Sequence, residues 1–166
     1  MAPLKMKGDL AELKVACDLV ERGYRVAIPF GEDCDFDLVF WETPERLERV
    51  QVKHARVRDG VIPVWCRSNS LTNGKVKRIK RYTARTVDWI AVYEPETNSC
   101  FYVHASELGD GRDMLSLRVA PTRNGQVIGV RYADDYRDPV RRHPKLMEPA
   151  GLEPATSSVQ GTRSPN

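Results

Sequence analysis

The chain has 166 residues, of which 41% are hydrophobic and 30% are charged, and its formal net charge is +3. This is the composition of a soluble globular protein, and a chain of this length can bury about two-thirds of its unfolded surface in one domain. No apolar run approaches the roughly 20 residues that span a bilayer, and residues 1–8 are not followed by the apolar core of a signal peptide. We therefore expect one cytoplasmic domain without a membrane partner.

The cysteines of the chain are widely spaced. They include no C-x-x-C pair, and no histidine stands at zinc-finger spacing from them. We interpret them as free, mostly buried thiols: Cys17, Cys34, Cys66 and Cys100.

The first predicted element is an amphipathic helix from Met6 to Arg22, which Gly23 ends. Glu12 shares a helical face with Ala16 and Leu19 and so lies at the edge of the apolar stripe. Two interpretations of Glu12 stay open, a solvated helix acid or a member of a site. The apolar residues that define the stripe are Leu10, Leu13, Ala16, Cys17, Leu19 and Val20.

Short runs rich in β-forming residues follow the helix. Pro63 places its strand at a sheet edge or at a bulge, because proline cannot donate to a ladder. Ser106 is a candidate cap for a brief helix at 107–108. The predicted strands are residues 24–28, 37–41, 49–56, 61–67, 87–93 and 100–104, with weaker candidates at 114–119 and 127–131.

Residues 37–53 form a predicted hairpin with one polar and one apolar face. Alternation along a strand puts Gln51 and Lys53 on one side and Val50 and Val52 on the other. Pairing of the two strands would bring Asp37 near Gln51 and Lys53. A carboxylate, an amide oxygen and an ammonium together suit a divalent metal and a phosphate, although an exposed amphipathic hairpin has the same pattern.

A basic segment occupies residues 68–85. Six of the eleven residues from Lys75 to Arg85 are basic and none is acidic. The segment has no strong periodicity, and Asn73 and Gly74 form a turn signal, so we interpret it as a loop. Such a charge density favours binding of a polyanion, and a merely solvated basic loop is the alternative.

The composition changes towards the end of the chain. Residues 136–166 are first basic and then rich in Pro, Ser and Thr, and such a segment cannot bury enough apolar area to offset its ordering entropy. We expect a folded domain at residues 1–135 and a disordered tail at residues 136–166.

The order of these motifs resembles the PD-(D/E)xK nuclease superfamily, and most closely its branch of small intron-encoded homing endonucleases and archaeal PD-(D/E)xK endonucleases. The resemblance covers roughly residues 6–105. It implies an α/β, restriction-endonuclease-like core with a central mixed β-sheet flanked by helices. The residues that carry it are Lys7–Glu12, Pro29–Asp33, Asp37–Val39, Val50–Lys53 and Asp88–Tyr93.

The resemblance assigns roles residue by residue. Glu12 is an outer metal ligand or water organiser, Asp37 is the central metal ligand, and Lys53 lies beside the attacking water. Gln51 departs from the pattern, which usually has Asp or Glu there; an amide oxygen can ligate Mg²⁺ but adds no charge. The implied metal ligands are Asp37, Gln51 and the Val52 carbonyl. Asp35 stays open as a substitute for Asp37 because it shares the strand face.

The function that this resemblance implies is a DNA endonuclease that hydrolyses phosphodiester bonds with Mg²⁺, or with Mn²⁺ in its place. The substrate would be double-stranded or branched DNA, cut by a homing-type or Holliday-junction-resolvase-like enzyme. Cutting both strands needs two sites, hence a homodimer or homotetramer. The alternatives are a nuclease-fold protein that binds nucleic acid without cutting it and a structural domain without a nucleic-acid role. The predicted DNA contacts are Arg67, Ser68, Lys75, Lys77, Arg78, Lys80, Arg81 and Arg85.

Several further residues have two interpretations. His54 is either a supporting partner of the site or a structural histidine, and His104 at a strand end looks structural. Tyr82 and Trp65 either stack on bases or belong to the core.

Overall fold

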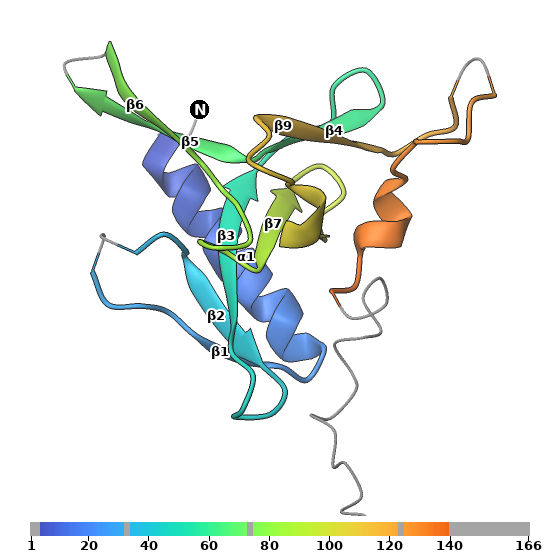
Figure 1. Ribbon diagram of the computed structural model, residues 1–166. Helices are drawn as coiled ribbons and strands as arrows, with labels where there is room; N and C mark the ends of the chain where they lie inside the picture. The colour runs from blue at the N-terminus through green and yellow to red at the C-terminus, as the bar shows by residue number, and fades with distance from the viewer. Residues whose placement is uncertain (1–3, 32–33, 73–74, 123–124, 140–166) are drawn as a thin grey trace, which may run out of the picture.

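The computed structural model describes residues 4–31, 34–72, 75–122 and 125–139. Its centre is a mixed sheet with the strand order β1-β2-β3-β7-β8 (Figure 1). Strands β3 and β7 are parallel, and the other neighbours are antiparallel. The predicted α/β fold with a central mixed sheet is therefore confirmed. The strands are β1 (Arg25–Ala27), β2 (Leu38–Trp41), β3 (Glu48–His54), β7 (Trp89–Glu94) and β8 (Ser99–His104).

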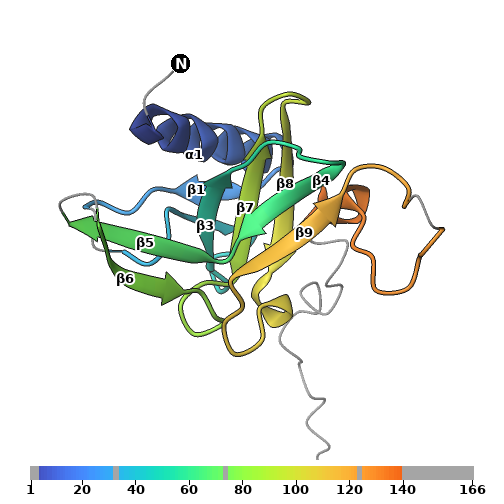
Figure 2. The same cartoon turned by 90° about the horizontal axis from the view of Figure 1, so that it is seen from above.

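One long helix, α1 (Leu4–Glu21), covers one face of this sheet. The other face carries two small antiparallel sheets, so this layer is β-structure rather than helix (Figure 2). One sheet pairs β4 (Val61–Trp65) with β9 (Met114–Arg118), and the other pairs β5 (Arg67–Thr72) with β6 (Lys75–Arg81). Pro63 lies in β4, which has a single partner strand, as its missing N–H predicts.

Two apolar cores lie on the two faces of the central sheet. On the α1 side, Ala11, Val15 and Leu19 pack with Val50 and Val52. The expected buried stripe of the helix is wrong in part, because Leu10, Leu13 and Val20 are 44%, 60% and 58% exposed. The second core joins the far side of β7 and β8 to β4 and β9; its members include Ile62, Val64, Ile90, Val92, Phe101, Val103, Leu115 and Leu117.

The basic segment is a hairpin and not the expected loop. Its strands β5 and β6 pair from Arg67 opposite Arg81 to Thr72 opposite Lys75. The register shifts between Ser70 and Leu71, as in a β-bulge. The predicted turn at residues 73–74 lies outside the described residues.

Smaller elements also differ from expectation. The short 3₁₀ helix η1 (Ala105–Glu107) is capped by His104, whose side chain accepts a hydrogen bond from the Ser106 N–H, so Ser106 is not the cap. Residues 127–131 form no strand; the 3₁₀ helix η2 (Ala133–Tyr136) follows them. Tyr136, one residue past the expected domain boundary, is fully buried, and the chain from residue 140 lies outside the described residues.

The described thiols divide evenly. Cys66 and Cys100 are buried, whereas Cys17 and Cys34 are exposed, so only half of them fit the expected burial. In the described ranges, no helix combines the length and apolarity that crossing a membrane requires.

Candidate active site

Asp37 lies immediately before β2 and faces the middle of β3. Its N–H donates to the Val50 carbonyl over 2.8 Å, and its carboxylate accepts hydrogen bonds from the Val52 N–H over 2.7 Å and from the Gln51 side-chain amide. The Gln51 amide nitrogen is also 3.4 Å from the Val52 carbonyl oxygen. Carboxylate, amide and carbonyl therefore converge on one point.

The predicted alternation along β3 is confirmed. Gln51 and Lys53 pair with Ile90 and Val92 of β7, which belong to the core on the face opposite α1. Val50 and Val52 pack instead in the core beneath α1. The two polar side chains thus share one face of the sheet because their neighbours bury the other.

Lys53 is held against an aromatic side chain. Its ammonium nitrogen lies 3.4 Å from the Tyr82 hydroxyl oxygen and 4.9 Å from the centre of the Tyr82 ring. Burial lowers the pKa of Lys53, and the negative charge of Asp37 raises it in part. Tyr82 is itself only 3% exposed, and its hydroxyl is hydrogen-bonded to the Ser68 side chain.

Asp37 and Glu12 both have raised pKa values. Burial raises the pKa of Asp37 and outweighs the Val52 N–H and the Lys53 charge, which lower it. Glu12 on α1 also has a raised pKa, because of burial and then because of the charges of Asp37 and Asp9. Glu12 on α1 therefore feels the charge of Asp37, and among the four residues that the sequence singled out, the hydrogen bonds and charges join Asp37 to Gln51 and Lys53.

The donors at this point fit a hard cation. Asp37, Gln51 and the Val52 carbonyl all offer oxygen, the ligand that Mg²⁺ prefers, provided that the Gln51 amide presents its oxygen rather than its nitrogen. Among the described residues, no group of three His, Cys, Asp or Glu side chains is placed to hold a metal. The site thus has fewer charged ligands than an all-carboxylate site would have.

Other candidates lie elsewhere. Asp37, Gln51, Lys53 and the Val52 carbonyl are called the Asp37 cluster below. Asp35 forms an ion pair with Lys80 of the hairpin and not with this cluster. The His54 ring packs edge-on against Tyr93 at 6.0 Å, and His104 packs against Trp89 at 4.7 Å. Trp65 is 44% exposed, with the Arg67 guanidinium 5.4 Å from its ring centre.

The residues predicted to contact DNA are distributed over the hairpin and the turn after it. Arg67 and Arg81 both form ion pairs with Asp113, at 3.5 and 2.7 Å, and Arg85 is exposed in the turn before β7. Ser68 is bonded to Tyr82 and thus belongs to the surroundings of Lys53. Lys75, Lys77 and Arg78 lie in β6, and their side chains are outside the described part of the structure.

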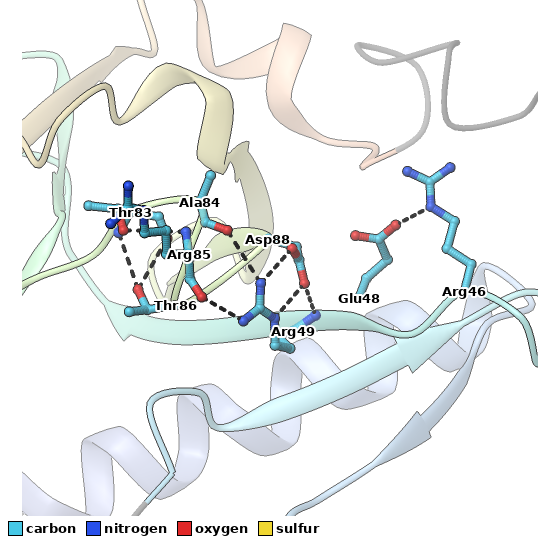
Figure 3. Close-up of polar contacts among 8 residues, drawn as sticks. All are labelled: Arg46, Glu48, Arg49, Thr83, Ala84, Arg85, Thr86 and Asp88. Atoms are coloured by element: carbon cyan, nitrogen blue, oxygen red, sulfur yellow. Dashed lines mark hydrogen bonds and ion pairs between the residues drawn. The ribbon is translucent and has the colours of Figure 1, made fainter.

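An ion pair that the sequence reasoning missed fixes the start of β3 (Figure 3). The Arg49 guanidinium contacts both Asp88 carboxylate oxygens, at 2.9 and 3.0 Å, and donates to the Arg85 and Ala84 carbonyls at 2.9 and 3.4 Å. The Arg49 N–H also bonds Asp88, over 2.8 Å. This pair ties the strand that carries Gln51 and Lys53 to the turn that carries Arg85.

Comparisons with known proteins identify a nuclease family and a structure of similar fold. The sequence pattern of the PD-(D/E)XK endonuclease family matches residues 3–139. None of the curated proteins compared with the chain matches it. A solved structure described as that of a bacterial homing endonuclease, I-Ssp6803I, is similar in fold with a TM-score of 0.65 and 21% sequence identity, over 82% of this chain and 89% of that one.

PD-(D/E)XK endonucleases are nucleases that act on DNA and generally use divalent metals. The match spans most of the chain and includes every residue of the Asp37 cluster. The chain belongs to the PD-(D/E)XK endonuclease family.

Proposed function

We propose that the protein is a metal-dependent DNA endonuclease that hydrolyses phosphodiester bonds, with Mg²⁺ as its cofactor and Mn²⁺ as a substitute. The observation that supports this most directly is the convergence of Asp37, Gln51 and the Val52 carbonyl beside the Lys53 ammonium. The family match makes a phosphodiester the bond that such a site would cut.

In this proposal each side chain has a separate task. Asp37, Gln51 and the Val52 carbonyl hold the cation, and Glu12 orients water from the α1 side. A bound cation would lower the pKa of a water ligand and neutralise a phosphate oxygen. Lys53 stabilises the negative charge that develops on the phosphoryl group, because its ammonium is kept in place by Tyr82 and the charge of Asp37 favours its protonated form.

The hairpin and the turn after it would bind the DNA backbone. The exposed Arg81 and Arg85 and the half-buried Arg67 and Lys80 supply positive charge on the face opposite α1. Double-stranded or branched DNA is the proposed substrate, cut in a homing-type or resolvase-like role. A homodimer or homotetramer would supply the two sites that cutting of both strands requires.

Cleavage assays test this function. Wild-type protein with Mg²⁺ or Mn²⁺ should nick or cut at least one of supercoiled, linear and four-way-junction DNA. Lys53→Ala and Asp37→Asn should abolish cutting but retain salt-sensitive DNA binding. The matched controls are Arg25→Gln and Glu21→Gln, which remove one exposed charge of the same sign away from the site. Cutting that persists in both site variants would contradict the proposed roles.

A second candidate is a nuclease-fold protein that binds nucleic acid without cutting it. It is favoured by Gln51, whose neutral amide stands where the family pattern has an acid and whose nitrogen faces Asp37. Wild-type protein that shifts DNA in a gel but cuts none of the three substrates with either metal would establish this alternative.

A further inference from the structure

A pocket of about 420 Å³ lies beside the β4–β9 sheet, and none of the residues that line it belongs to the Asp37 cluster. Its wall is made by β9 and by residues 129–131, and Val61 of β4 contributes to it. Ile62, Val64, Leu115 and Leu117 of these strands are buried in the second core. Alternation turns Val61, Met114, Ser116 and Arg118 to the opposite side of the sheet, and these residues line the pocket together with the buried Leu115.

Three arginines line this pocket: Arg112, Arg118 and Arg131. Arg131 is held by an ion pair with Glu107 at 2.9 Å, and the Tyr136 hydroxyl donates to the same carboxylate oxygen over 2.9 Å. Within the described residues, neither Arg112 nor Arg118 forms an ion pair with a carboxylate. In the described part of the chain, an ion pair with a carboxylate therefore compensates one of the three guanidinium groups.

Backbone hydrogen bonds hold the main chain at these arginines. The Arg118 N–H donates to the Arg131 carbonyl over 2.7 Å, and Arg118 forms an isolated bridge with Tyr132. The Arg112 N–H donates to the Leu108 carbonyl over 3.1 Å. Guanidinium groups suit the several oxygens of a phosphate, which they can bind through paired N–H donors.

The pocket is connected to the proposed DNA-binding hairpin. Strand β4 ends at Trp65 and β5 begins at Arg67, so one ribbon of chain, broken only at Cys66, runs from the pocket into the hairpin (Figure 2). Burial raises the pKa of the Cys66 thiol to about 11, while Arg112, Lys53 and Arg131 each lower it. Cys66 therefore feels the charges of both the pocket and Lys53.

We infer that this arginine pocket binds a phosphate group, and specifically a backbone phosphate of the DNA substrate away from the bond that is cut. The inference rests on the proposed endonuclease function, which supplies the polyanion. The pocket volume exceeds the roughly 30 Å³ share of one water molecule many times, so a phosphate with its sugar can enter. A free phosphate or nucleotide has the same chemistry and is the other source to be tested.

The test is the salt dependence of DNA binding, measured by fluorescence anisotropy with a labelled duplex of mixed sequence and without a catalytic metal. Arg118→Gln and Arg112→Gln should each weaken binding about tenfold, the expected effect of removing a charge-assisted hydrogen bond. The slope of log K against log [KCl] should become shallower by roughly 0.9 for each phosphate that the variant no longer neutralises. Arg118→Lys should restore most of the slope, and Arg25→Gln on β1 should change it little.

Three measurements separate the outcomes. Equal melting temperatures show that the variants fold. Unchanged affinity and slope in both glutamine variants, with a wild type that binds and cuts DNA, would overturn the pocket and leave the proposed function standing. Binding of inorganic phosphate is measured by NMR titration of the arginine side-chain signals. If Arg118→Gln abolishes phosphate binding but leaves DNA affinity unchanged, the pocket binds free phosphate and not the DNA backbone, and the DNA assignment is overturned. A wild type that neither binds nor cuts DNA would overturn both.

Discussion

The Lys53 ammonium lies 3.4 Å from the Tyr82 hydroxyl and 4.9 Å from the centre of the Tyr82 ring. Tyr82 therefore holds this ammonium both by a hydrogen bond and by a cation–π contact. The hydroxyl is in turn bonded to Ser68 of β5. The hairpin thereby reaches Lys53 through a buried side chain.

Replacing Tyr82 with Phe tests this arrangement. The ring and its contact with the ammonium stay, but the hydroxyl is removed, so Lys53 should be less well oriented while DNA binding is unaffected. We expect a roughly tenfold lower single-turnover cleavage rate, in the range seen when a supporting partner of a site residue is removed, with an unchanged KM for DNA. Ser68→Ala should have a smaller effect in the same direction. A rise in KM at constant rate would show that Tyr82 acts in DNA binding instead.

Gln51→Glu restores the acid of the family pattern. A second carboxylate beside Asp37 should strengthen metal binding, so the Mg²⁺ concentration for half-maximal cleavage should fall. Without metal the two carboxylates repel each other, and the buried position raises the cost of charge there. Thermal denaturation in EDTA should therefore show a lower melting temperature than wild type, and added Mg²⁺ should raise it more in the variant.

Gln51→Leu is the matched variant of similar size that offers no oxygen. It should lose cleavage with Mg²⁺ while keeping its fold in EDTA, because the Asp37 carboxylate retains the Val52 N–H. Cleavage at the wild-type rate in Gln51→Leu would mean that the amide is not a ligand.

Arg49 and Asp88 should contribute to stability as a pair. Burial raises the pKa of Asp88, but the hydrogen bonds from Arg49 outweigh this and lower it overall. A carboxylate whose pKa is lowered in the folded state stabilises the protein fully when the pH is above the pKa of the unfolded state, about 3.9. This stabilisation is lost as the pH falls through the pKa of the folded state. The loss of stability of wild type below about pH 4 should be reduced in Asp88→Asn.

Urea denaturation measures the pair directly. Arg49→Met and Asp88→Asn should each lower the free energy of unfolding by about 2 kcal/mol at neutral pH, because a partly buried partner loses its charge-assisted bonds. The double variant should lose clearly less than the two single losses added together. Strict additivity would show that the two side chains stabilise the fold independently.

Features of the structure that depend on neighbouring residues could be predicted from the sequence, whereas those that depend on the pairing of distant strands could not. The two-residue alternation that joins Gln51 and Lys53 is a property of a single strand and could be predicted. The Arg49–Asp88 pair depends on the parallel register of β3 and β7, in which Val50 lies opposite Trp89. No local pattern fixes that register, although an acid and a base at the starts of two strands were a usable signal.

Two of the errors on the elements, the buried stripe of α1 and the loop expected for the basic segment, have physical causes. Helix α1 has two apolar stripes, and packing on the sheet selected the smaller Ala11, Val15 and Leu19 over the row with Leu10 and Leu13. In the basic segment, Val76 and Ile79 stand three residues apart, which breaks the period of a strand. The register shift beside Ser70 and Leu71 inserts an extra residue in β6 and accounts for this spacing.

The acid that holds the hairpin arginines should limit DNA affinity. Asp113 forms ion pairs with Arg67 at 3.5 Å and with Arg81 at 2.7 Å, so part of the positive charge is neutralised before DNA arrives. Asp113→Asn frees both guanidinium groups without changing the size of the side chain. Nonspecific DNA affinity should rise, and the slope of log K against log [KCl] should steepen by about 0.9 for each further phosphate that the arginines neutralise. Glu21→Gln removes an exposed acid from α1, on the opposite face, and should leave the slope nearly unchanged (Figure 2). A weaker binding of DNA by Asp113→Asn would show instead that Asp113 orients the two arginines for the backbone.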